Sequence, residues 1–244
     1  MFHALSARLM LAIALAIGMI GCGDSADEAA PITTDTAAAA AAPASMGSAQ
    51  YTVVVKSRWT RANHPFEYPS SGALTGPHFS GVIGVAHNDS YSIFREGAPP
   101  TPGLESLSET GKHGPLDDEI RAAAASGGAG TLFETGPLRD FGDSLVTTVT
   151  VDEKHPLVSL VAMVAPSPDW FTGVSSVNLV ENGQWVASRT LEVNAYDSGG
   201  DEGATYKAPD KDNNPKKPTK VADTPHFRVN GALVPVATVT FRKN

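Results

Sequence analysis

Three aspartates stand among residues that would suit a metal ion. Asp169 lies in the stiff, apolar segment PSPDWF (166–171), where a carboxylate is unexpected. Asp197 and Asp201 lie close together in the glycine-rich segment DSGGDEG (197–203). Calcium takes about six to eight oxygen ligands from carboxylates, backbone carbonyls and water. A calcium site in this protein would therefore join a glycine-rich loop to a carboxylate from a distant part of the chain.

The spacing of these residues alone favours a plainer interpretation. The segment 197–203 has the composition of a polar turn, and Asp169 would also serve as an ordinary turn or cap residue. A metal site therefore needs support from more of the sequence than these two segments.

Residue types that carry out catalysis are present without a catalytic pattern. The sequence has no G-x-S-x-G elbow, no H-E-x-x-H motif and no glycine-rich phosphate loop. We expect a protein that is not an enzyme, and we interpret His87 and His155 as structural hydrogen-bonding groups. The other histidines of the region after residue 50 are His64, His78, His113 and His226.

The charge balance excludes a class of partner. The 244 residues carry a formal net charge of −8, whereas nucleic-acid binders neutralise phosphates with clustered Lys and Arg. A local basic cluster, Lys216, Lys217 and Lys220, lies in a Pro/Asn/Asp-rich stretch that we interpret as a solvated loop. We expect no nucleic-acid partner.

The N-terminus indicates export. Arg8 precedes the apolar run LMLAIALAIGMI (9–20), which has the length of a signal-peptide core. The run leads into Cys22, the single cysteine, and MIGC resembles a bacterial lipobox with Met19 in place of the usual Leu. We predict a signal peptide over 1–21 and a lipidated Cys22. An ordinary secretion signal with an incidental cysteine is the alternative.

The rest of the chain divides into a tether and one β domain. Residues 22–49 are rich in Ala, Pro and Thr and too poor in large apolar groups to fold, so we interpret them as a disordered tether. From residue 50 to 244, β-branched runs alternate with Gly, Pro, Asn and Asp, which predicts an all-β antiparallel sandwich. The expected strands are 51–59, 81–87, 144–151, 157–164, 174–180, 184–193 and 232–241, and the expected helices are 102–111 and 115–126.

Two short signals refine this prediction. Asn182-Gly183 supplies the positive φ angles of a tight turn, so 174–180 and 184–193 should form a hairpin. Pro235 lacks an amide hydrogen, which places the last run at a sheet edge or bulge.

Several separated motifs together resemble the spondin N-terminal domain family. They are NHPFEYP (63–69), PHFSGVIGVAHNDSYSIFREG (77–97), HPLVSLVAMVAPSPDWFTGVSSVNLVENGQW (155–185) and YDSGGDEGATY (196–206). The resemblance covers about residues 50–244. It implies a C2-like antiparallel sandwich of about eight strands that holds calcium in loops at one end.

The resemblance also implies which residues bind the ion. Carried onto this sequence, the metal ligands are Asp169, Asp197 and Asp201. Ser198 and Gly200 stand where the family has Ala and Thr, and the family's cysteines are missing. The three aspartates are retained despite these differences.

Together these features predict a lipid-anchored protein of the bacterial cell envelope that binds calcium and acts by adhesion or ligand binding. The expected partners are a protein or glycan at the cell surface and, through the lipid anchor, the membrane. A polysaccharide-binding accessory or hydrolase of the envelope and a purely structural envelope protein are the alternatives.

The anchor can be tested by replacing its cysteine. Cys22→Ser should release the protein from the membrane fraction or leave it unprocessed. The expected change is large because one acyl chain binds membranes marginally, while two or more anchor stably. Fractionation and metabolic labelling with a fatty-acid analogue measure the effect. An unlabelled wild-type protein would rule out the anchor.

Overall fold

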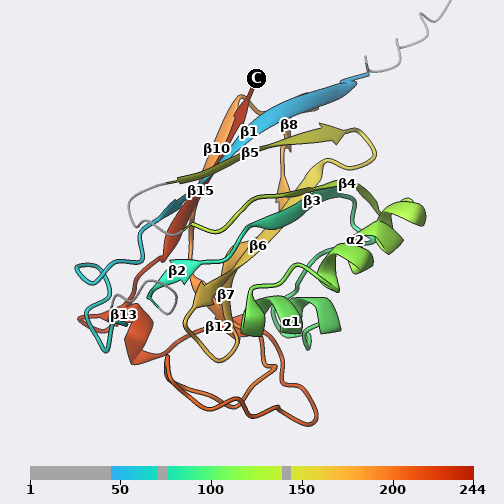
Figure 1. Cartoon of the computed structure of the whole chain (residues 1–244). Helices are drawn as coiled ribbons and strands as arrows, with labels where there is room; N and C mark the ends of the chain where they lie inside the picture. The colour runs from blue at the N-terminus through green and yellow to red at the C-terminus, as the bar shows by residue number, and fades with distance from the viewer. Residues whose placement is uncertain (1–44, 71–75, 139–143) are drawn as a thin grey trace, which may run out of the picture. The chain divides into compact units, whose positions relative to one another are not determined.

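The computed structural model describes residues 45–70, 76–138 and 144–244, and shows two antiparallel β-sheets packed face to face (Figure 1). The four-stranded sheet has the order β10 (Ser188–Val193), β15 (Ala237–Lys243), β1 (Ser48–Ser57), β5 (Ser144–Asp152). The larger sheet has the order β12 (Lys220–Val221), β11 (Ala195–Asp197), β7 (Trp170–Asn178), β6 (Leu157–Ala165), β3 (Ile83–His87), β4 (Ala129–Glu134), and β2 (His78–Phe79) pairs with β6. The antiparallel sandwich predicted from the sequence is confirmed, although the described strands outnumber the expected eight because several contain only two or three residues.

The main core lies between the two sheets. On β1, Tyr51, Val53 and Val55 alternate inward, as a strand with one buried face should. The same core receives Trp170 from β7 and Phe241 from β15. The sequence alternation of these strands therefore translates directly into one shared interior.

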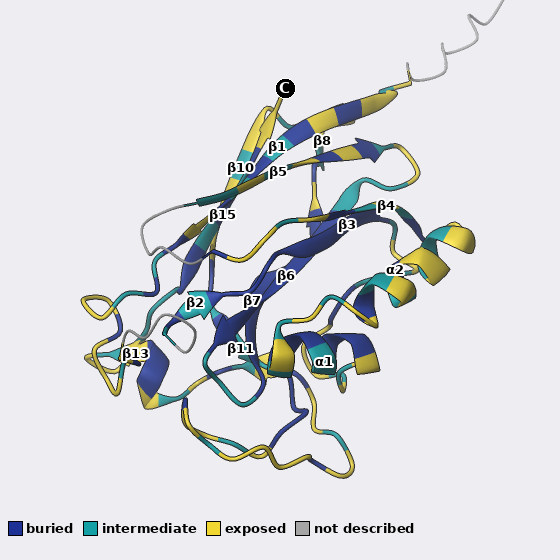
Figure 2. Ribbon diagram, in the orientation of Figure 1, coloured by how far each residue is buried: buried dark blue, intermediate teal, exposed yellow. Residues whose placement is uncertain are grey.

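A second core separates the larger sheet from two helices. The helices α1 (Pro102–Thr110) and α2 (Leu116–Ala125) cover the outer face of this sheet (Figure 1). Their apolar residues pack against residues such as Val161 of β6 and Phe171 of β7. Apart from Ser159, the run 157–165 is apolar without alternation because β6 is buried on both faces. Figure 2 shows β3 and nearly all of β6 in dark blue.

The helix and turn signals are confirmed. Pro102 occupies the first turn of α1, where Thr101 caps the helix by accepting a hydrogen bond from the Leu104 amide. Asn182 and Gly183 both have positive φ, 51° and 71°, and join the short strands β8 (Val180–Glu181) and β9 (Gln184–Trp185).

Three strand assignments were wrong. The expected strand 174–180 begins earlier, at Trp170, and the expected strand 184–193 divides into β9 and β10. Pro235 does not mark an edge. The last run breaks there into β14 (Ala232–Leu233), which pairs with β13 (Arg228–Val229), and β15, which lies between β10 and β1.

The domain begins slightly before the expected position. β1 starts at Ser48, and the Glu153 carboxylate accepts hydrogen bonds from the Met46 and Gly47 amides just before it. The predicted signal peptide, Cys22 and the tether up to residue 44 lie outside the described residues. Within the described ranges, no helix combines the length and the apolar composition needed to cross a membrane.

Candidate metal centre

Strand pairing brings the three aspartates to one end of the larger sheet. Asp169 ends the turn that joins β6 to β7, and Asp197 ends β11. Because β11 pairs antiparallel with β7 in the register Asp197↔Trp170, Asp169 lies beside the start of the 197–203 loop. The Ser198 amide donates to the Asp169 backbone carbonyl over 3.2 Å. The register of one short strand therefore joins segments that are far apart in the sequence.

The apolar neighbours of Asp169 hold it in place. Trp170 and Phe171 point to opposite faces of β7, so Trp170 enters the core between the sheets and Phe171 enters the core beneath the helices. The Trp170 ring packs edge-on against Tyr206 and Phe227. Two anchored aromatic side chains thus fix the backbone at the point where Asp169 presents its carboxylate.

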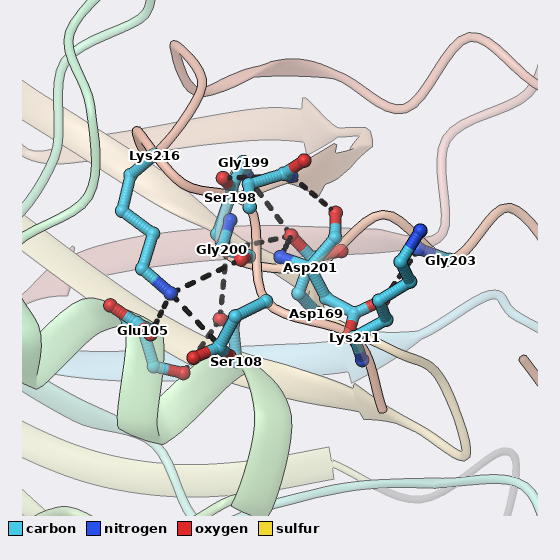
Figure 3. Close-up of polar contacts among 12 residues, drawn as sticks. Glu105, Ser108, Asp169, Ser198, Gly199, Gly200, Asp201, Gly203, Lys211 and Lys216 are labelled. Atoms are coloured by element: carbon cyan, nitrogen blue, oxygen red, sulfur yellow. Dashed lines mark hydrogen bonds and ion pairs between the residues drawn. The ribbon is translucent and has the colours of Figure 1, made fainter. Parts of the chain in front are cut away.

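The Asp169 carboxylate is fully buried, and its two oxygens differ sharply in their contacts (Figure 3). Oδ2 accepts hydrogen bonds from the Ser198 hydroxyl (3.0 Å), the Gly199 amide (3.0 Å) and the Asp201 amide (3.1 Å). Oδ1 is buried and has no hydrogen-bond partner among the described residues. A buried oxygen without a partner is costly, and a cation bound at Oδ1 would remove that cost.

The pKa of Asp169 is raised to about 6, first by burial and second by the negative charge of Asp197. The three donors to Oδ2 oppose it by stabilising the ionised form. The three donors hold the Asp169 carboxylate in position, and its raised pKa indicates that a positive counter-charge is lacking.

Asp197 shares a donor with Asp169. The Gly199 amide lies 2.9 Å from Asp197 Oδ1, so one N–H serves both carboxylates. The other Asp197 oxygen lies 3.4 Å from the Lys220 ammonium at the surface. Gly199 has φ 86°, and a Cβ there would lie 2.1 Å from the Lys217 carbonyl oxygen, so only glycine fits.

Asp201 has a different set of contacts. Its carboxylate accepts hydrogen bonds from the amides of Gly203 and Lys211 within its own loop, while its backbone amide donates to Asp169. In the part of the chain that the structure describes, the trio of acidic residues whose ligand oxygens lie within 4.8 Å of one another is Glu105, Glu109 and Asp212. The structure therefore joins Asp169, Asp197 and Asp201 in one network without bringing their three carboxylates to one point.

That acidic trio already has a cation from the chain itself. The Lys216 ammonium forms an ion pair with Glu105 and lies 3.5 Å from an Asp212 oxygen and 3.3 Å from the Gly200 carbonyl oxygen. Figure 3 shows Lys216 reaching from its loop to Glu105 on α1. Lys216 thus ties the loop to the helix, and this lysine is not simply a solvated loop residue.

The sequence analysis missed two polar residues of the network. Ser198 accepts a hydrogen bond from Ser108 of α1 over 3.1 Å and donates to Asp169, so it links the helix to the buried carboxylate. Asn213 is buried and donates its side-chain amide to the Gly199 and Asp201 carbonyls. Its Oδ1 has no hydrogen-bond partner in the described part of the chain. Ser198 was visible as a departure from the family pattern, whereas nothing in the sequence marks Asn213.

The histidines have structural partners, as expected for His87 and His155. His87 Nε2 lies 2.7 Å from the Ser159 hydroxyl, and both residues are fully buried. His155 Nδ1 lies 3.1 Å from an Asp152 oxygen in a tight turn.

The donor chemistry of the network fits a hard cation. Its free or shareable ligand atoms are all oxygens, and the buried Oδ1 of Asp169 is the one that most needs a positive charge. Asp169 and Asp197 would hold calcium, with carbonyl oxygens of the glycine-rich loop. The Asp201 carboxylate would bind the ion only if it gave up its hydrogen bonds from the Gly203 and Lys211 amides.

The buried carboxylate predicts a pH dependence of stability in chelator. Because the pKa of Asp169 rises from its ordinary 3.8 to about 6 in the folded state, the folded protein binds the extra proton. The contribution of this group to the free energy of unfolding should therefore fall by about 3 kcal/mol as the pH rises from about 3 to about 7. Asp169→Asn should remove this contribution to the pH dependence of the free energy of unfolding. Urea unfolding at a series of pH values measures that dependence. The same pH dependence in the wild type and in Asp169→Asn would contradict the raised pKa of Asp169.

Comparison with known proteins agrees with this architecture. A family model described as Spondin_N matches residues 49–227. The chain is 29% identical to spondin-2 of Rattus norvegicus over 205 residues, covering 79% of this chain and 61% of that protein. It is 27% identical to spondin-1 of Xenopus laevis over 216 residues, covering 81% of this chain and 25% of that protein. The chain thus spans about three fifths of the spondin-2 length and a quarter of spondin-1, and it belongs to the spondin N-terminal domain family.

Proposed function

We propose that this domain is a calcium-dependent binding module that acts in adhesion or ligand recognition rather than catalysis. The observation that carries the proposal is the unpartnered, fully buried Oδ1 of Asp169 beside the carboxylate of Asp197. The absence of a hydrolase motif in the sequence and the burial of the His87–Ser159 pair are consistent with binding.

Calcium would supply charge and rigidity to this end of the sandwich. Neutralising Asp169 and Asp197 removes their mutual repulsion and ties the β6–β7 turn to the 197–203 loop. A loop held in one conformation presents its exposed residues to a partner with less entropy lost on binding. The ion would therefore have a structural role, which is to order the binding surface, and would take no part in a chemical reaction of the ligand.

The setting of the domain is part of the same proposal. Lipid attached to Cys22 would hold the protein at the bacterial cell envelope. The tether between membrane and domain would end before Met46, because Met46 and Gly47 already bind Glu153 of the domain. The ligand would then be a protein or glycan at the cell surface.

Calcium should raise the melting temperature measurably. Extracellular modules bind calcium with dissociation constants of about 10⁻⁴ to 10⁻³ M, and a concentration about 100-fold higher adds about 2.7 kcal/mol. For a domain of this size the expected shift is about 5 to 10 °C. Asp169→Asn and Asp197→Asn should abolish it.

Two further variants sharpen the measurement. Asp118→Asn on α2 removes an exposed carboxylate with the same change of charge, so it should retain the full shift. Asp201→Asn should both weaken the calcium shift and loosen its loop, because this side chain binds the loop amides. A melting temperature unchanged by calcium, together with no heat in titration calorimetry of chelator-treated protein, would contradict the proposal.

A further inference from the structure

Of the strands that end the two sheets of the sandwich, β5 has an edge without the usual protection. β12 contains only two residues, and β10 carries Arg189 and Glu192, each in an ion pair. Short or charged edges resist pairing with a further strand. β5 has nine residues, and its segment SLVTTVTV (144–151) contains no charge and no proline. Its edge is therefore suited to bind another strand.

The backbone groups of every second residue of β5 point away from its sheet. The Asn244 amide donates to the Gln50 carbonyl, so the even-numbered residues of β1 bond to β15 and the odd-numbered ones bond to β5. The register Tyr51↔Val149 then assigns the odd-numbered residues of β5 to β1. The amides and carbonyls on the free edge are those of Val146, Thr148 and Thr150. No hydrogen bond to these groups is found in the described part of the chain, so the edge presents an open row of donors and acceptors.

A hollow of about 350 Å³ lies beside this edge, between β5 and β4 of the other sheet. Buried Val149 of β5 and Phe133 of β4 contribute apolar surface to its lining. Farther along β5, Val146 is 60% exposed. Figure 1 shows β4 and β5 running beside each other at this side of the sandwich. An added strand would therefore cover apolar surface as well as backbone groups.

One charge marks the end of the edge. Asp152, the last residue of β5, lines the hollow, and 48% of its side chain is exposed. Its carboxylate lies 3.1 Å from His155 Nδ1, and no Lys or Arg contributes to the lining. A lysine or arginine opposite Asp152 would thus meet a complementary charge, whereas a carboxylate would be repelled.

We propose that the edge of β5 binds an extended peptide segment of a protein partner by strand addition. The peptide would run antiparallel to β5, with a basic residue opposite Asp152 and β-branched residues beside 146–150. A glycan or a lipid head group does not offer N–H and C=O groups at the spacing of a strand. A strand within another folded sheet has its inward side chains in its own core, so a free segment is needed to fill the hollow. The inference rests on the proposed function as a binding module and names its class of partner.

The geometry of the edge specifies the peptide. Opposite residues of an antiparallel pair share a face of the sheet and a hydrogen-bonding pattern. Val149 and Val151 point into the core, so Val146, Thr148 and Thr150 lie on the outer face. Peptide residues that bond to these three therefore point outward, and the residues between them point into the hollow. In the probe acetyl-Lys-Val-Thr-Val-Thr-Val-Thr-amide, the threonine amides would bond to β5 and the valines would enter the hollow.

Two methylated isomers of this probe test the pairing on the mature protein. N-methyl groups on two threonines remove donors that face β5, whereas N-methyl groups on two valines leave those donors intact. The unmethylated and valine-methylated peptides should bind with a dissociation constant on the order of 0.1 mM, and the threonine-methylated peptide at least about tenfold more weakly. Replacing the lysine by glutamine should weaken binding about two- to fivefold. Shifts of the Val146, Thr148 and Thr150 amides in ¹⁵N-resolved NMR titrations measure the affinities.

A matched pair of variants tests the edge itself. Thr148→Pro removes a free amide without removing a hydrogen bond to β1, because this amide points away from β1. It should weaken the unmethylated peptide at least about fivefold, whereas Thr148→Ala keeps the amide and should bind within about twofold of the wild type. Melting curves confirm that each variant is folded. If Thr148→Pro fails to fold, the methylated isomers decide the outcome.

Hydrogen exchange separates a peptide partner from a second copy of the chain. The free-edge amides should exchange faster than those of Thr147 and Val149, and should slow when the peptide is added. Slowing that instead follows the concentration of the protein alone would assign the edge to a second copy and overturn the proposal.

Titrations in excess calcium and in chelator should give the same affinities, so the strand site and the metal centre can fail separately. Equal affinity for the two methylated isomers, or unchanged peptide binding by folded Thr148→Pro, would also overturn the proposal.

Discussion

The burial of one carboxylate, that of Asp169, organises the end of the sandwich where the candidate metal centre lies. Its Oδ2 binds two backbone amides and one hydroxyl of the 198–201 segment, so the β6–β7 turn and this loop cannot move independently. Its Oδ1 has no hydrogen-bond partner among the residues that the structure describes. The arrangement fixes the loop and at the same time leaves a negative charge that a cation would neutralise.

The segments joined by Asp169 are also anchored in both cores. Trp170 and Phe171 anchor the strand on its two faces, and Ser108 and Ser198 connect the carboxylate to α1. Lys216 fastens the following part of the loop to the same helix. The helices therefore do more than cover the sheet, because α1 supports the loop that carries Asp201.

Patterns within single segments predicted most of the fold, whereas contacts between segments escaped prediction. Proline and glycine marked both helices to within a residue or so, and β-branched runs located the long strands. β11 contains three residues, too few for a pattern, yet its register with β7 places Asp197 beside Asp169. The sequence named the three aspartates through family resemblance. It could not show that the Asp201 carboxylate binds amides of its own loop, because that depends on how the chain returns at Lys211.

Terbium luminescence tests directly whether Oδ1 of Asp169 binds a cation. Terbium occupies calcium sites and emits when a nearby excited indole transfers energy to it, and Trp170 directly follows Asp169 in the chain. We expect indole-sensitised emission that calcium displaces, that Trp170→Phe strongly reduces and that Asp169→Asn abolishes. Emission of equal strength in Asp169→Asn, or no sensitised emission from the wild type, would contradict the account.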